Sequence, residues 1–139
     1  MRLSLRRIAA LAILAGAMSL SAQAAQTQLS ATLRVTVDGV TSAGGTLRVG
    51  LYDEATFPAI ADFALFKREI PRIAGDVAVV FERLPPGTYA VRVFQDLNDN
   101  GRADAGEPMG VSNAAARENF TGAALVLHPG ANMAAIHLR

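Results

Sequence analysis

The sequence predicts an all-β fold, a two-layer antiparallel β-sandwich of six or seven strands with at most one short helix. Short segments alternate apolar and polar residues with period two, which is typical of strands with one buried face. Clusters of Gly, Pro, Ser and Asn separate these segments, as turns do. Because each strand offers one apolar face, a second sheet must cover it, and a sandwich meets that requirement.

The first two strands are predicted at residues 29–38 and 46–51. In the first strand the apolar residues from Leu33 to Val37 share one face, and the second strand alternates in the same way. The intervening residues 41–45 are rich in Gly, Ser and Thr. We therefore expect these two strands to form a hairpin.

Four more strands are predicted around residues 77–81, 89–93, 123–127 and 133–138, again from alternation. The Leu-Pro-Pro-Gly sequence at 84–87 indicates a well-defined turn, because proline sets φ and glycine permits positive φ.

A short helix or an irregular flap is predicted at residues 57–67, where apolar residues recur every three to four positions. Its large apolar residues are Phe57, Ile60, Phe63 and Phe66. They could form a binding surface or cap the core of the sandwich. Capping is the favoured interpretation, because large apolar side chains are more often buried than exposed in a patch.

The N-terminus has the features of a secretory signal: three arginines precede an uncharged apolar run at residues 8–20. Ala22 and Ala24 supply the small side chains that a signal peptidase requires, so we place the cut after Ala24. A membrane anchor is the alternative, but the run is shorter than the roughly 20 residues that cross a bilayer. Residues 1–24 are thus a predicted cleaved signal peptide, and 25–139 a single domain.

Composition excludes several classes of function for the mature chain. Removing the three signal arginines leaves 10 basic residues against 12 acidic ones, a net charge of −2. The basic residues are scattered, so no nucleic-acid partner is expected. The absence of cysteine excludes both a disulfide and a lipidated N-terminal cysteine.

The segment 96–107 has the spacing of a twelve-residue calcium loop. Residues with side-chain oxygens stand at positions one, three, five, nine and twelve, and glycine stands at position six. The predicted metal ligands are Asp96, Asn98, Asn100, Arg102 through its backbone carbonyl, Asp104 and Glu107. Calcium takes six to eight oxygen ligands, so we expect calcium as a cofactor, with a weak affinity of about 0.1 to 1 mM.

The alternative for this segment is an Asx-rich turn, held without metal by hydrogen bonds from the backbone to side chains. With calcium as the role of the loop, Asp96→Ala should leave the calcium-free domain folded, because the sandwich core would not depend on the loop. Asp99, between the predicted ligands, should point to solvent.

Other candidates for chemistry are weak. His128 and His137 have no neighbours at metal-ligand spacing, so both are interpreted as solvated. Ser112 lacks the flanking glycines of a nucleophile elbow, and no catalytic residue is predicted. Tyr89 follows Pro-Gly at the start of a strand, as does a corner tyrosine whose hydroxyl bonds to the backbone.

The pattern Phe81-x-x-Leu84-Pro85-x-Gly87-x-Tyr89, followed by the acidic loop and Ser112-Asn113, resembles the bacterial exported domain-of-unknown-function 2141 family. The resemblance covers nearly all of the mature chain. Its outline is similar to Ig-like, prealbumin-like and Cna-B-like sandwich modules. It implies a sandwich and a periplasmic or surface location, and it implies no activity.

Together these observations predict an exported, non-catalytic binding or interaction module, periplasmic or secreted and monomeric. Its partner would be an envelope protein, a glycan or a small ligand. A structural or adhesive accessory of the envelope, self-associating through exposed sheet edges, is the alternative. An enzyme that uses the loop carboxylates is less favoured, because nothing in the sequence indicates a cleft or an open coordination position.

Overall fold

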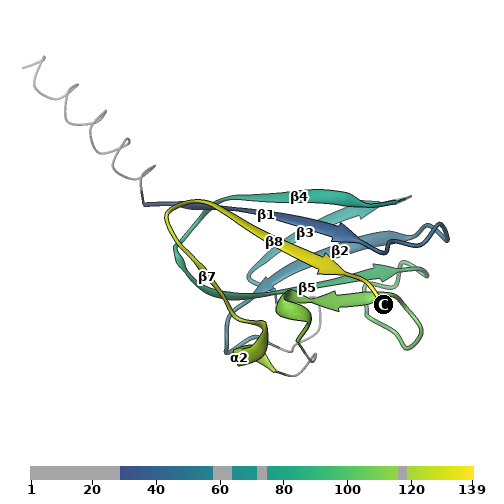
Figure 1. Cartoon of the computed structure of the whole chain (residues 1–139). Helices are drawn as coiled ribbons and strands as arrows, with labels where there is room; N and C mark the ends of the chain where they lie inside the picture. Colours follow the sequence, from purple (N-terminus) through teal and green to yellow (C-terminus); the bar gives the residue numbers. More distant parts are fainter. Residues whose placement is uncertain (1–28, 58–63, 72–74, 116–118) are drawn as a thin grey trace, which may run out of the picture.

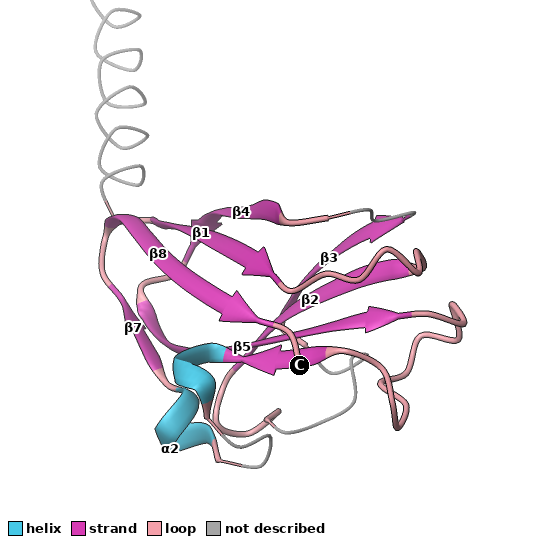
Figure 2. Ribbon diagram, turned by 45° about the vertical axis from the view of Figure 1, so that its right-hand side comes forward, coloured by secondary structure: helices cyan, strands magenta, loops and turns pink. Residues whose placement is uncertain are grey.

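The alternating segments pack as two sheets in a computed structural model that describes residues 29–57, 64–71, 75–115 and 119–139 (Figures 1 and 2). The elements are β1 (Ala31–Asp38), β2 (Thr46–Tyr52), β3 (Phe66–Pro71), β4 (Val77–Leu84), β5 (Gly87–Asp96), β6 (Met109–Val111), the 3-10 turn η2 (Ser112–Ala114), the single-turn helix α2 (Phe120–Ala123), β7 (Leu125–Leu127) and β8 (Gly130–His137). None of the helices in these described ranges is long and apolar enough to span a membrane.

The two sheets differ in size and in strand direction. The first has the order β4-β1-β8, with β4 antiparallel and β8 parallel to the central strand β1. The second has the order β3-β2-β5-β6, all antiparallel, and β7 pairs with the start of β5. Figure 2 shows the two layers face to face, with α2 at the margin of the larger sheet.

The main core lies between the sheets and consists of the inward-facing residues of both. From β1 it takes Leu33 and Val35, and from β2 and β5 it takes Leu47, Leu51 and Val91, each fully buried. Burying one such side chain stabilises the fold by about 1.5–3 kcal/mol. The alternation of apolar and polar residues in the sequence therefore identifies the inner face of each strand.

The predicted fold class is confirmed, with differences in detail. The described chain has eight strands rather than six or seven, because β3 and the three-residue β6 carry too little alternation to be recognised. The antiparallel prediction is wrong for one pair, since β8 runs parallel to β1. The two-layer outline is compatible with prealbumin-like modules.

The predicted hairpin between the first two strands is wrong. β1 and β2 lie in different sheets, so residues 39–45 cross from one layer to the other. β1 pairs instead with β4, and β2 pairs with β3 and β5. Turn residues mark where the chain reverses direction, but they do not say whether the reversal stays within one sheet.

Part of the segment predicted as a helix or flap lies outside the described residues, and its described residues lie in two different apolar clusters. Ile60 and Phe63 lie outside the described residues, whereas Phe66 begins β3 and packs against the main core. Phe57 is buried in a second apolar cluster on the outer face of the larger sheet, where its ring meets Tyr52 edge-on at 6.0 Å and Phe120 at 5.9 Å. Phe57 and Phe66 therefore have packing roles, as favoured from the sequence.

Candidate cation-binding loop

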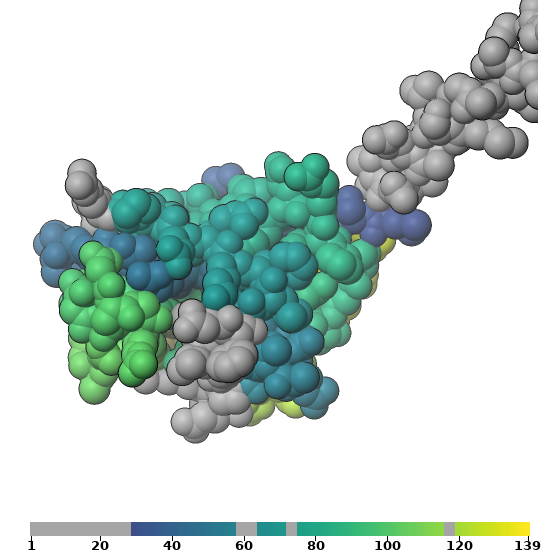
Figure 3. All heavy atoms as spheres, turned by 180° about the vertical axis from the view of Figure 1, so that it is seen from behind, coloured from purple at the N-terminus to yellow at the C-terminus, as the bar shows by residue number. Residues whose placement is uncertain are grey.

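The loop 96–107 connects the antiparallel neighbours β5 and β6 at the end of the sandwich where the chain terminates (Figure 1). Seen from behind, it forms the bright green projection at the left of the molecule (Figure 3). Its ends are fixed by the sheet, because the Gln95 N–H donates to the Pro108 carbonyl at 2.9 Å. The chain between them must therefore close a compact turn.

Asp96, the last residue of β5, is fully buried. Its Oδ1 accepts a hydrogen bond from the Asn100 N–H at 3.1 Å, and its Oδ2 accepts one from the Gly101 N–H at 2.7 Å. The same Oδ2 accepts from Arg48 Nε at 2.6 Å. Gly101 has a φ of 79°, which brings its N–H to the carboxylate and which glycine adopts without strain. Asp96 thus caps the loop backbone and forms a buried ion pair.

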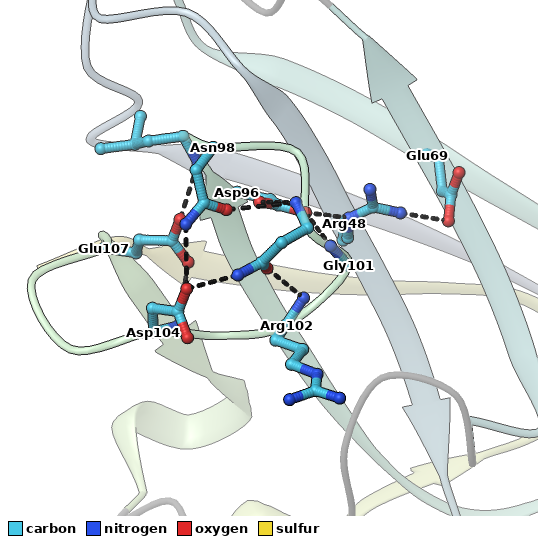
Figure 4. Close-up of polar contacts among 10 residues, drawn as sticks. Arg48, Glu69, Asp96, Asn98, Gly101, Arg102, Asp104 and Glu107 are labelled. Atoms are coloured by element: carbon cyan, nitrogen blue, oxygen red, sulfur yellow. Dashed lines mark hydrogen bonds and ion pairs between the residues drawn. The ribbon is translucent and has the colours of Figure 1, made fainter.

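Arg48 reaches Asp96 from the outer face of β2 (Figure 4). Its other side contacts Glu69 of β3, with Nη1 and Oε1 2.5 Å apart. Burial alone would lower the pKa of Arg48, but the hydrogen bond to Asp96 and the charges of both carboxylates raise it above the ordinary value. The guanidinium therefore stays charged and joins the loop to two strands.

Asp104 accepts hydrogen bonds from both asparagines of the loop. Its Oδ2 accepts from Asn98 Nδ2 at 3.0 Å and from Asn100 Nδ2 at 2.6 Å. The amide oxygens of both asparagines accept backbone N–H groups two residues later, from Asn100 at 3.1 Å and from Arg102 at 2.8 Å. These are Asx turns, which explains why Asn stands at both positions.

Glu107 closes the loop from its far end and is 8% exposed. Its Oε1 accepts the Leu97 N–H at 2.8 Å, and its Oε2 accepts the Asp104 N–H at 3.0 Å. In Figure 4, Asn98, Asp104 and Glu107 are directed toward one another inside the loop, whereas the Arg102 side chain leads away from it. Asp99 is exposed, as expected from the sequence.

The predicted side-chain ligands lie in one loop, but their carboxylates face different partners. Asp96 faces Arg48, whereas Asp104 faces the two asparagine amides. Within the described ranges, no three His, Cys, Asp or Glu side chains are arranged to hold a metal ion. The contacts present are those of the Asx-turn alternative. A carboxylate oxygen has two lone pairs, so it can accept an N–H and bind a cation at the same time.

The expectation that Asp96 is dispensable for folding disagrees with this geometry. Its carboxylate satisfies two backbone N–H groups and neutralises a largely buried guanidinium. Removing it would take the acceptor from the Gly101 N–H and from Arg48 Nε, whereas the Asn100 N–H would keep Asn98 and the guanidinium would keep Glu69. A buried donor left unsatisfied costs about 1–3 kcal/mol. Asp96 is therefore part of the fold with or without a cation. The sequence reasoning missed Arg48, because only strand pairing places it beside the loop.

Gln95 secures the neighbouring loop 39–45 from the same end of β5 and is fully buried. Its Oε1 accepts from Thr41 N at 2.9 Å and from Thr41 Oγ1 at 3.1 Å. Its Nε2 donates to the carbonyls of Thr41 at 3.0 Å and Gly44 at 2.6 Å. Gln95 and Asp96 therefore hold the two adjoining loops in place from consecutive positions.

Three residues weighed for chemistry have structural contacts. The Tyr89 hydroxyl donates to the Pro85 carbonyl at 2.9 Å, which confirms the corner tyrosine. Ser112 Oγ accepts from Val91 N and donates to the Ala123 carbonyl, so it bridges β5 and α2. His137 Nδ1 lies 2.6 Å from Asp38 Oδ1, so this histidine is exposed but has a partner.

A small cavity of about 40 Å³ lies beside the loop, lined by residues that include Arg48, Lys67, Glu69 and Gly101. A water molecule occupies roughly 30 Å³ in the liquid. The cavity therefore has room for ordered water beside the loop.

Comparison with known proteins supports one assignment. The family model described as "Uncharacterized protein conserved in bacteria (DUF2141)" matches residues 35–135. The chain belongs to the DUF2141 family. The match begins inside β1 and ends inside β8, so the DUF2141 domain includes both sheets and the loop 96–107. Neither the curated proteins nor the solved structures give a match.

The carboxyl of Asp104 should titrate below its ordinary pKa of 3.8, because the hydrogen bonds from Asn98 and Asn100 and the charge of Arg102 favour its ionised form. A depressed pKa stabilises the fold above the ordinary value, and this contribution is lost as the pH falls through the folded pKa. Carboxyl carbon shifts in an NMR titration measure it. We expect replacement of both asparagines by alanine to move the pKa back upward; no movement would show that these bonds do not form in solution.

Proposed function

We propose that the protein is an exported, non-catalytic binding or interaction module of the bacterial periplasm or envelope, whose loop 96–107 binds calcium weakly. The observation that carries the proposal is the coincidence of the full calcium-loop spacing with a compact loop that turns Asn98, Asp104 and Glu107 inward. The description of the matching family names no activity.

The contacts of Arg48 support a weak rather than a tight site. Its guanidinium already neutralises Asp96, so a cation that uses this carboxylate must compete with a bound positive charge. Asp104 offers a more accessible ligand, because its Oδ1 accepts no hydrogen bond from the described residues. An affinity of about 0.1 to 1 mM is typical of extracellular calcium modules.

Calcium should raise the thermal stability of the protein. At a free concentration about ten times the dissociation constant, mass action stabilises the folded state by about 1.4 kcal/mol. In a domain of this size the melting temperature should rise by about 5 °C, and magnesium should do much less because it gives up its water reluctantly. Differential scanning calorimetry with and without each ion measures the shift.

Asp104→Asn and Asp99→Asn form a matched pair of variants for this test. Both remove one negative charge from the same loop, but only Asp104 faces its interior. The calcium increment should disappear in Asp104→Asn and persist in Asp99→Asn. Identical melting curves for the parent protein with and without millimolar calcium would instead establish the loop as a metal-free Asx turn.

A further inference from the structure

Asn100 is the only one of the five asparagines in the chain that precedes a glycine. Glycine has no side chain to hinder its backbone nitrogen from approaching the preceding carboxamide, so cyclisation is easiest in this dipeptide. Asn100 is exposed on the projecting loop of Figure 3, where water reaches it. A side chain at Gly101 would meet no neighbouring atom within 4 Å. The sequence and the exposure together single out Asn100 for chemical modification by its own backbone.

The reaction would need only the chain and water. The Gly101 nitrogen loses its proton and bonds to Asn100 Cγ, the bond from Cγ to Nδ2 breaks, and Nδ2 leaves as ammonia. Water then opens the resulting succinimide ring at either carbonyl. One opening gives aspartate, and the other gives isoaspartate, in which the main chain runs through the former side chain. In balance, one amide and one water become one carboxylic acid and one ammonia, with no oxidant or cofactor.

In the closed loop, both reacting groups are held by other contacts. The Gly101 N–H donates to the buried carboxylate of Asp96 at 2.7 Å, and this negative charge opposes loss of the proton. The Asn100 carboxamide accepts from the Arg102 N–H at 2.8 Å and donates to Asp104 Oδ2 at 2.6 Å. Nδ2 must gain a proton to leave, but an ionised carboxylate has none to give. Cyclisation therefore requires the loop to open locally.

We propose that Asn100 is a self-modification site, whose conversion to aspartate and isoaspartate is held back by the closed loop and follows its opening. Arg48 belongs to the same restraint, because its Nε and the Gly101 N–H share Asp96 Oδ2. The rate of conversion is the rate in the free dipeptide multiplied by the fraction of molecules in which the loop is open.

Both products disfavour the closed loop. Aspartate at position 100 places a carboxylate oxygen where Nδ2 now donates to Asp104, so two like charges face each other. Isoaspartate lengthens the main chain and moves the Gly101 N–H away from Asp96. Because hydrolysis of the ring releases ammonia, the change is not reversed when the loop closes. The modification thus turns a transient opening into a lasting one.

Peptide mapping by mass spectrometry measures the conversion in protein purified from expression of the full chain. Trypsin cleaves after Arg92 and Arg102, which places Asn98 and Asn100 in one fragment. At neutral pH, Asn100 should convert at least about tenfold more slowly in the folded protein than in guanidinium chloride, because two hydrogen bonds to carboxylates must open. Asn98 precedes aspartate and is the internal control. Equal rates in the folded and unfolded protein, or conversion of Asn98 as fast as Asn100 when unfolded, would overturn the proposal.

Asp104→Ala and Asp99→Asn separate local opening from global unfolding. Asp104→Ala removes the acceptor of Asn100 Nδ2 and leaves Asp96 with its partners. Asp99→Asn removes the same charge at an exposed neighbour, where asparagine tolerates the φ of 55°. Conversion of Asn100 should accelerate about threefold or more in Asp104→Ala and stay within about twofold of the parent in Asp99→Asn, with circular dichroism confirming both folds. An unchanged rate in Asp104→Ala, or the same acceleration in both variants, would refute the restraint.

Discussion

Arg48→Met is expected to destabilise the protein by about 2–4 kcal/mol, because it leaves the buried carboxylate of Asp96 without its counter-charge. The loss lies at the lower end of the range for broken buried ion pairs, since two backbone N–H groups still solvate the carboxylate. Urea unfolding followed by circular dichroism measures it. Arg34→Met makes the same change at an exposed position of β1 and should stay within about 0.5 kcal/mol of the parent.

A double-mutant cycle separates the ion pair from the packing of the arginine stem. Asp96→Asn in the Arg48→Met background should cost less than in the parent, because the neutral amide needs no counter-charge. The absence of such coupling would mean that Arg48 acts through its contacts with β3 alone. If the loop binds calcium, Arg48→Met should also enlarge the calcium increment, since the cation then competes with no guanidinium for Asp96.

Gln95→Ala is expected to destabilise the protein by about 2–4 kcal/mol, because it opens a cavity at a fully buried site and removes hydrogen bonds to three backbone groups. The affected loop, residues 39–45, is the crossing between the two sheets. Hydrogen exchange at the Thr41 amide should accelerate together with the loss of unfolding free energy.

Thr41→Ala provides the matched control for this site. It removes only the hydroxyl that donates to Gln95 and keeps every backbone contact, so its effect should stay below about 1 kcal/mol. An equally small effect of Gln95→Ala would show that water replaces the amide, and that the crossing loop is held by its own backbone.

The loop shows how much of a site the spacing of residues in the sequence can predict. The spacing from Asp96 to Glu107 correctly placed a compact turn with inward-facing Asn98, Asp104 and Glu107, because alternate residues of a tight coil point inward. It did not reveal that Asp96 is fully buried against Arg48. The two residues are 48 positions apart in the sequence and meet only because β2 pairs with β5.

The sequence by itself determined the strands with a clear inner face, the corner role of Tyr89 and the all-β class, because each depends on neighbours within a few positions. Tertiary structure alone decided which strands became partners: it placed β1 and β2 in separate sheets and set β8 parallel to β1. Strand pairing depends on registers between distant segments, and a local pattern of alternation is the same for every possible partner. The carboxylates of the loop follow the same rule, since the sequence supplied them and the pairing of β2 with β5 assigned Asp96 its counter-charge.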